Sequence, residues 1–149
     1  MRRIKGVKKN HKKLGNRIVL GAVMAMLLQA TVVPVLASNY HDTPFDFDFT
    51  KGYWQCTPER AKEDDTSVYM YCKWSESEGD SYDAYVWGWS PSDDTEFQTD
   101  NGPYTFYEGT VRYMTNWVYE NDLEYAYVRA RHTGSGEGHF TGVWSPDSI

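Results

Sequence analysis

Residues 67–75, SVYMYCKWS, alternate two kinds of side chain along the chain. The positions that would share one face of an extended strand are Val68, Met70, Cys72 and Trp74. The opposite face would carry two tyrosines and a lysine. Successive side chains of a β-strand point to opposite sides of the sheet, so an alternation with a period of two predicts a strand with one buried face.

A second run of the same kind follows after a short polar linker. Residues 76–81, ESEGDS, have the composition of a turn, and residues 82–90, YDAYVWGWS, resume the alternation. Two alternating runs joined by a short segment that contains glycine favour a β-hairpin. We therefore expect the two runs to pair with each other in one sheet.

The rest of the chain after residue 40 continues this pattern of short β-rich runs and polar turns. Further strands are predicted within residues 45–49, 53–56, 104–122, 123–133 and 139–144, and loops at 57–66 and 90–103. Within the run 104–122, Glu108 and Gly109 indicate a second hairpin or a bulge, and its end is ambiguous between strand and helical turn. About seven strands with turns at this spacing predict an all-β fold, a single antiparallel β-sandwich.

Composition leads to the same fold class. All 24 aromatic residues lie after residue 37, where alanine, leucine and lysine are scarce. Aromatic side chains favour the half-buried, pleated surface of a sheet. No helix of substantial length is therefore predicted in this part of the chain.

Residues 1–37 have the composition of an export signal. Their first part carries eight basic and no acidic residues, and residues 18–37 are almost entirely apolar and end in small side chains. This pattern predicts a secretory signal peptide that is cleaved between Ala37 and Ser38. The alternative is an uncleaved membrane anchor, because about 20 apolar residues can span a bilayer. We expect residues 38–149 to be secreted as one domain.

Without the leader the chain is strongly acidic. Residues 38–149 hold 7 basic and 21 acidic side chains, which gives a net charge of −14. A surface with this charge repels the phosphates of nucleic acids and the headgroups of anionic lipids. We therefore expect no nucleic-acid partner and, after cleavage, no membrane partner.

Two cysteines remain in the predicted secreted domain. Cys56 and Cys72 would meet an oxidising exterior, where paired cysteines form disulfides. A disulfide between them would close a short loop and add about 3 kcal/mol to the free energy of unfolding. The alternative is two reduced, buried thiols.

The motif Trp-Ser-Pro occurs twice, in GWSPSDD at residues 88–94 and in TGVWSPDSI at residues 141–149. Proline cannot donate a hydrogen bond to a neighbouring strand, so each copy is predicted to end a strand. Asp93 and Asp147 would then accept backbone N–H groups in a turn. The alternative interpretation is a pair of ligand-binding loops.

The number of aromatic rings exceeds what a core of this size is expected to hold. Tyr85, Trp87 and Trp89 are the candidate binding surface, because tyrosine and tryptophan offer flat apolar area with a polar group. A glycan is one candidate partner for such rings. The alternative is a cross-strand aromatic ladder that only stabilises the sheet.

Signals for catalysis or metal binding are weak. His132, Glu137 and His139 surround a glycine-rich turn and are the only candidates for a small hydrolase or a metal pair. One loop carries four acids that could bind calcium, Asp93, Asp94, Glu96 and Asp100. Their spacing lacks the pattern of a calcium-binding loop, and we expect no cofactor and no enzymatic activity.

The chain resembles small secreted proteins of unknown function from Gram-positive bacteria. The resemblance lies in DTPF at residues 42–45, in residues 60–70, in RYMTNWVYE at residues 112–120 and in the terminal GVWSPDS. The β-rich architecture behind a signal peptide is also similar, more remotely, to lactococcin-type bacteriocins. This group of proteins carries no assigned activity, so the resemblance by itself implies no function. We expect a secreted, non-enzymatic interaction protein or a bacteriocin-like protein that acts on an extracellular or cell-surface partner. The alternatives are a carbohydrate-binding module that uses exposed tryptophan and tyrosine rings and, more remotely, a small hydrolase.

Overall fold

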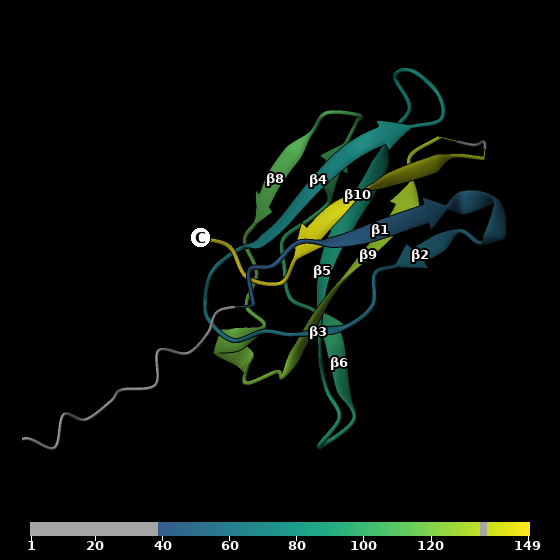
Figure 1. Cartoon of the computed structure of the whole chain (residues 1–149). Helices are drawn as coiled ribbons and strands as arrows, with labels where there is room; N and C mark the ends of the chain where they lie inside the picture. The colour runs from purple at the N-terminus through teal and green to yellow at the C-terminus, as the bar shows by residue number, and fades with distance from the viewer. Residues whose placement is uncertain (1–38, 135–136) are drawn as a thin grey trace, which may run out of the picture. The chain divides into compact units, whose positions relative to one another are not determined.

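The computed structural model describes residues 39–134 and 137–149, which form an all-β fold (Figure 1). The ten strands of this part are β1 (Thr43–Asp48), β2 (Trp54–Cys56), β3 (Arg60–Ala61), β4 (Val68–Ser75), β5 (Tyr82–Ser90), β6 (Thr95–Gln98), β7 (Tyr104–Phe106), β8 (Val111–Met114), β9 (Tyr125–His132) and β10 (His139–Ser145). Two short 3-10 turns, η1 (Phe49–Lys51) and η2 (Tyr119–Asn121), complete the described elements.

The predictions for the N-terminal segment concern residues outside this part. The apolar stretch 18–37 and the cleavage site between Ala37 and Ser38 are not among the described residues. Among those that are described, no helix has the length and apolar character required to cross a bilayer.

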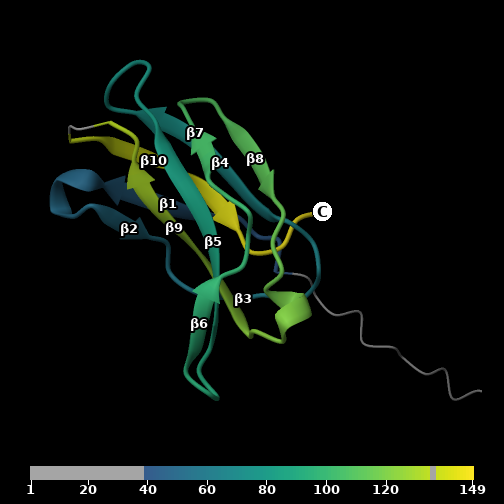
Figure 2. The same ribbon diagram turned by 180° about the vertical axis from the view of Figure 1, so that it is seen from behind.

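The strands form two antiparallel sheets that pack as a sandwich (Figures 1 and 2). One sheet has four strands in the order β1-β10-β4-β8. The other has six strands, with β2-β9-β5-β6 in sequence across the sheet, β3 also paired with β9 and β7 also paired with β5. The predicted antiparallel sandwich is thus confirmed, with ten strands rather than about seven.

The additional strands are short and lie where loops were predicted. β3 has two residues within the predicted loop 57–66, and β6 has four within the predicted loop 90–103. The run 104–122 divides into β7, β8 and the turn η2. Segments this short contain too few residues for an alternation to be recognised, and their neighbours in the sheet hold them extended.

Aromatic side chains from both sheets fill the space between them. Tyr82 on β5 is completely buried and stacks on Phe106 of β7, with ring centres 5.1 Å apart. Across the sandwich it meets the edges of Phe140 at 5.0 Å and Phe47 at 5.5 Å. Burial of each such ring contributes about 2–3 kcal/mol. Buried rings of β1, β5, β7 and β10 therefore hold the two sheets together in one core.

The hairpin predicted between residues 67–75 and 82–90 is wrong, and so is the hairpin alternative within residues 104–122. β4 and β5 lie in different sheets, so residues 76–81 connect the two layers instead of turning within one. β7 and β8 are divided in the same way, and Gly109 in the turn between them has a φ of 81°. An alternation shows which side of a strand is buried, but it does not show which strand lies beside it.

A bulge also changes the direction of one predicted core residue. Thr141 of β10 pairs with Trp74 and Gly142 pairs with Cys72, so Lys73 is an extra residue on β4. The extra residue shifts the alternation by one position. As a result Trp74 is 44% exposed on the outer face, and the side chain buried at this end of β4 is Ser75.

The predicted disulfide is absent, because the two cysteines lie on different faces of different sheets. Cys56 is exposed on β2 and pairs with Arg129 across the six-stranded sheet. Cys72 is buried on β4 of the four-stranded sheet. Both are free thiols. Burial raises the pKa of Cys72 to about 11, which further lowers its reactivity.

Candidate functional site

The predicted binding residues lie together on the outer face of the six-stranded sheet. Along β5 the inward positions are buried, and the outward positions Tyr85, Trp87 and Trp89 are partly exposed. The strand is long and central, with β9 on one side and β6 and β7 on the other. The period-two pattern therefore placed these three residues on the correct face.

Neighbouring strands add aromatic and basic residues to the same face. Tyr127 of β9 is the register partner of Trp87, and Tyr125 is the partner of Trp89. Trp54 comes from β2 on the far side of β9. The term aromatic face is used below for the outward residues Trp54, Tyr85, Trp87, Trp89, Tyr125, Tyr127, Arg129 and Arg131.

Rings on the aromatic face contact one another between strands. The ring centres of Trp54 and Tyr85 are 5.8 Å apart, in an edge-to-face arrangement. Trp89 and Tyr125 are 5.6 Å apart. Such contacts hold the rings in fixed orientations and contribute about 0.5–1.5 kcal/mol each beyond the burial of area.

Arg129 lies between two of the tryptophans. Its guanidinium carbon is 4.7 Å from the ring centre of Trp54 and 4.9 Å from that of Trp87. Because β2 and β5 flank β9, the two rings reach Arg129 from opposite sides. No described residue accepts a hydrogen bond from this side chain, and its Nε is buried.

Arg131, two positions further along β9, has a different environment. Its Nη2 lies 3.5 Å from a carboxylate oxygen of Asp83, and its guanidinium is 5.8 Å from the ring centres of both Trp54 and Tyr85. The phenol of Tyr85 is the main cause of a raised pKa for Arg131, and Asp83 adds to it. Asp83 in turn accepts a hydrogen bond from Thr105 at 2.8 Å. Arg131 is thus a paired cation.

The β6 edge of the aromatic face is polar. The hydroxyl of Tyr127 donates to Oε1 of Glu96 at 2.5 Å. Burial and this contact raise the pKa of Tyr127 above its usual range. Glu96 therefore orients a ring of the aromatic face and, through it, the adjacent Trp87.

The three residues of the hydrolase hypothesis have separate surroundings. His132 is paired with Asp80, with Nε2 to Oδ1 at 2.6 Å, and its side chain is almost fully buried. His139 lies on the other sheet and is paired with Asp46 at 2.7 Å. Glu137 is exposed. In the described part of the chain, no group of three or more His, Cys, Asp or Glu side chains is arranged to hold a metal ion.

The acids of the calcium hypothesis are not brought together either. Asp93 accepts from the backbone of Thr95 at 3.2 Å, and Glu96 bonds to Tyr127. Asp100 is buried and accepts from the backbone N–H of Val86 at 2.7 Å. Burial raises the pKa of Asp100. These acids close the turns around β6, which explains their density in the sequence.

Both Trp-Ser-Pro copies end strands as predicted, at Ser90 in β5 and at Ser145 in β10. Asp93 forms the predicted turn with Thr95. Asp147 does not, because it is completely buried and has more distant partners. The tryptophans also differ: Trp89 belongs to the aromatic face, and Trp144 is fully buried in the core.

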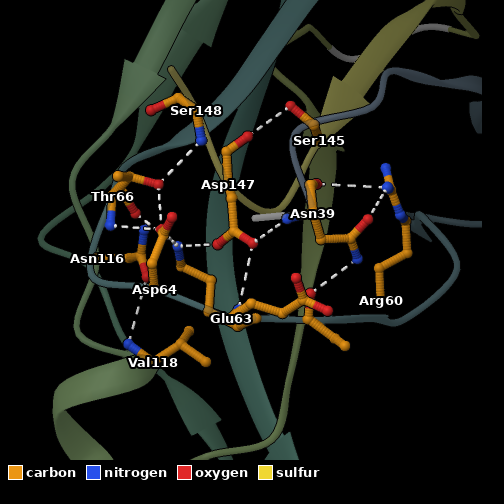
Figure 3. Close-up of polar contacts among 12 residues, drawn as sticks. Asn39, Arg60, Glu63, Asp64, Thr66, Asn116, Val118, Ser145, Asp147 and Ser148 are labelled. Carbon is orange, nitrogen blue, oxygen red and sulfur yellow. Dashed lines mark hydrogen bonds and ion pairs between the residues drawn. The ribbon is translucent and has the colours of Figure 1, made fainter. Parts of the chain in front are cut away.

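Asp147 is the centre of a polar cluster that joins the C-terminus to two other segments (Figure 3). Its Oδ1 lies 2.6 Å from Nζ of Lys62, and neither side chain is exposed. Its Oδ2 accepts backbone N–H groups from Asn39 at 2.8 Å and Glu63 at 3.2 Å. Lys62 also donates to the carbonyl of Thr66 at 2.6 Å. Every polar atom named here is satisfied internally, so this cluster is structural.

Sequence reasoning missed part of the aromatic face and part of the polar cluster around Asp147. Trp54, Arg129 and the Lys62–Asp147 pair were not assigned roles. The alternation of β9 does place Arg129 opposite the core, which is the one signal that indicated its position. The distant partners of Asp147 leave no local signal.

Comparison with curated proteins gave no match, and comparison with solved structures gave none. The resemblance to lactococcin-type bacteriocins and the Gram-positive origin therefore stay predictions. A family model described as "Protein of unknown function (DUF2712)" matches residues 33–148. With most of its length matched, the chain belongs to this family of proteins of unknown function.

Proposed function

We propose that the protein is an exported, non-enzymatic binding protein that holds a cell-surface glycan on its aromatic face. The observation that carries the proposal is the gathering of six aromatic side chains from three adjacent strands on one side of one sheet. Tyr127 is buried, and the other five rings keep exposed surface whose flat shape and fixed orientation suit stacking against the apolar faces of sugar rings. The polar groups beside the rings can bind sugar hydroxyls.

The position of the rings supports binding over a purely structural role. Trp54 is 37% exposed, although it lies on a strand whose neighbour β9 carries further rings. If the rings served only to stabilise the sheet, burial of the Trp54 indole would add the most to stability. The exposed area of Trp54 instead extends the row of rings to the edge of the sheet.

The surroundings of the histidines support a protein that binds its ligand without transforming it. His132 and His139 are each engaged by a carboxylate, and they belong to different sheets. His132 follows Arg131 on β9, but its side chain is almost fully buried and packs against Phe140. Among the described residues, the acids paired with the aromatic face are Asp83 and Glu96, which are bonded to Arg131 and Tyr127. The leader-like residues 1–37 and the acidic domain support an extracellular location and a glycan instead of a nucleic acid or a membrane.

The test is a glycan panel with the full chain and two tryptophan variants. Trp54→Ala removes an exposed ring from the aromatic face. Trp74→Ala removes a similarly exposed ring from the other sheet and is the matched control. We expect binding of at least one glycan, a loss of about tenfold or more in Trp54→Ala, and no change in Trp74→Ala. Absence of binding to any glycan, or equal losses in the two variants, would overturn the proposal.

A further inference from the structure

Arg129 is a cation whose hydrogen-bonding groups the fold does not use. The rings of Trp54 and Trp87 lie close to it, but no carboxylate or carbonyl of the described residues accepts from its guanidinium. Arg131 has Asp83, and Arg60 on the same sheet donates to the carbonyl oxygen of His41 at 2.6 Å. Arg129 differs from both although it is partly buried.

A partly buried guanidinium without an acceptor is unfavourable. An unsatisfied buried donor costs about 1–3 kcal/mol, and more when the group is charged. The two neighbouring indoles offset part of this cost through cation–π attraction, worth about 0.5–2 kcal/mol per ring. The indoles supply no oxygen acceptor for the N–H groups, which lie in the plane of the guanidinium. These in-plane donors match the two oxygens of a carboxylate.

We propose that Arg129 binds a carboxylate carried by the glycan, so that the ligand class is an acidic oligosaccharide whose sugar rings stack on the neighbouring indoles. This inference rests on the proposed glycan-binding function and specifies its ligand. The guanidinium can bind both oxygens of a carboxylate, and the indoles of Trp54 and Trp87, with ring centres 4.7 Å and 4.9 Å from its carbon, are close enough to contact the adjoining sugar rings. Arg129 supplies the positive charge that the carboxylate requires.

The net charge of the domain further restricts the class of possible ligands. Residues 38–149 carry a net charge of −14, which repels a polymer with a charge on every sugar. Screening limits this repulsion to about 10 Å at moderate salt, so one carboxylate held by Arg129 is still attracted locally. The ligand is therefore an oligosaccharide with isolated carboxylates among uncharged sugars.

The test compares two probes of nearly the same shape. One is an oligosaccharide with a single terminal glucuronic acid, and the other is its methyl ester, which lacks the negative charge. Titration calorimetry with the full chain should show at least tenfold tighter binding of the acid. Arg129→Gln should abolish this preference and leave the affinity for the ester within about twofold, which also shows that the variant is folded. Arg112→Gln, an exposed arginine on β8 of the other sheet, should behave as wild type.

The possible results distinguish a failure of the proposed role of Arg129 from a failure of the proposed glycan binding. Equal binding of acid and ester would overturn the role of Arg129 and leave glycan binding intact. Binding of neither probe, together with an empty glycan panel, would overturn both. Tighter binding of the corresponding sugar phosphate would refute the assignment to a carboxylate. Arg129→Lys should lose most of the preference, because an ammonium group lacks the planar pair of donors.

Discussion

Replacement of Asp147 by asparagine tests the polar cluster at the C-terminus. The substitution keeps an oxygen that can accept the backbone N–H groups of Asn39 and Glu63, but it removes the negative charge 2.6 Å from Nζ of Lys62. The Lys62 ammonium is then completely buried with one carboxylate, that of Asp64, at 3.5 Å. Breaking a buried ion pair costs about 3–5 kcal/mol.

This loss is large compared with the stability of a small domain. The free energy of unfolding of a domain of this kind is about 5–15 kcal/mol, so Asp147→Asn should remove about a fifth or more of the total. Because Asp64 retains part of the attraction, we expect a value near the lower limit, about 3 kcal/mol. Urea unfolding followed by tryptophan fluorescence measures this loss in the free energy of unfolding. The fluorescence reports on unfolding because Trp144, three residues from Asp147, is buried in the folded protein.

The other Trp-Ser-Pro copy provides the control. Asp93 is exposed and accepts one backbone hydrogen bond, so Asp93→Asn should cost less than about 1 kcal/mol. The reasoning is refuted if the free energies of unfolding of Asp147→Asn and Asp93→Asn, measured in urea, differ by less than about 1 kcal/mol. In that case the ion pair would contribute no more than an exposed turn.

Three further predictions concern other parts of the fold. Gly142→Ala would place a Cβ 2.0 Å from a backbone oxygen of β4, so it should destabilise by at least about 2 kcal/mol, and an unchanged melting temperature would contradict this close approach. A thiol reagent should modify Cys56 in the native protein and Cys72 only after denaturation; simultaneous reaction, or no reaction without reductant, would be inconsistent with the structure. The pKa of Asp48 should be about 2 by NMR titration, because Lys51 and a turn hydrogen bond favour the carboxylate, so its contribution to stability is present above 3.8 and is lost as the pH falls towards 2. Lys51→Met should return this pKa towards 3.8, and an unchanged value would exclude the ion pair as its cause.

For the long strands, the side of the sheet on which each side chain lies could be predicted, because buried and exposed side chains alternate along a strand. On β5 the sequence places Tyr85, Trp87 and Trp89 outward, and the structure agrees. Trp74 shows the limit of this reasoning, since one bulged residue, Lys73, reverses its direction. A bulge depends on the strand opposite, and the local sequence does not contain that strand.

The candidate site was predictable in part for the same reason. The outward residues of β5 could be named from their own strand, but Trp54 and Arg129 reach them only through the pairing β2-β9-β5. The paired residues lie more than about 35 positions apart in the chain, as with Trp89 and Tyr125. No pattern in the sequence itself connects them.

By itself, the sequence determined the fold class, the buried side of the long strands except at the bulged end of β4, the ends of β5 and β10, and the acidic character of the domain. These properties depend on local chemistry, such as side-chain alternation, the missing N–H of proline and the count of charges. Only the tertiary structure decided which strands are neighbours, that Cys56 and Cys72 are apart, and that Arg129 lies between two indoles. The physical reason is that strand pairing and sheet packing are contacts between distant segments, and their free energy depends on all partners at once.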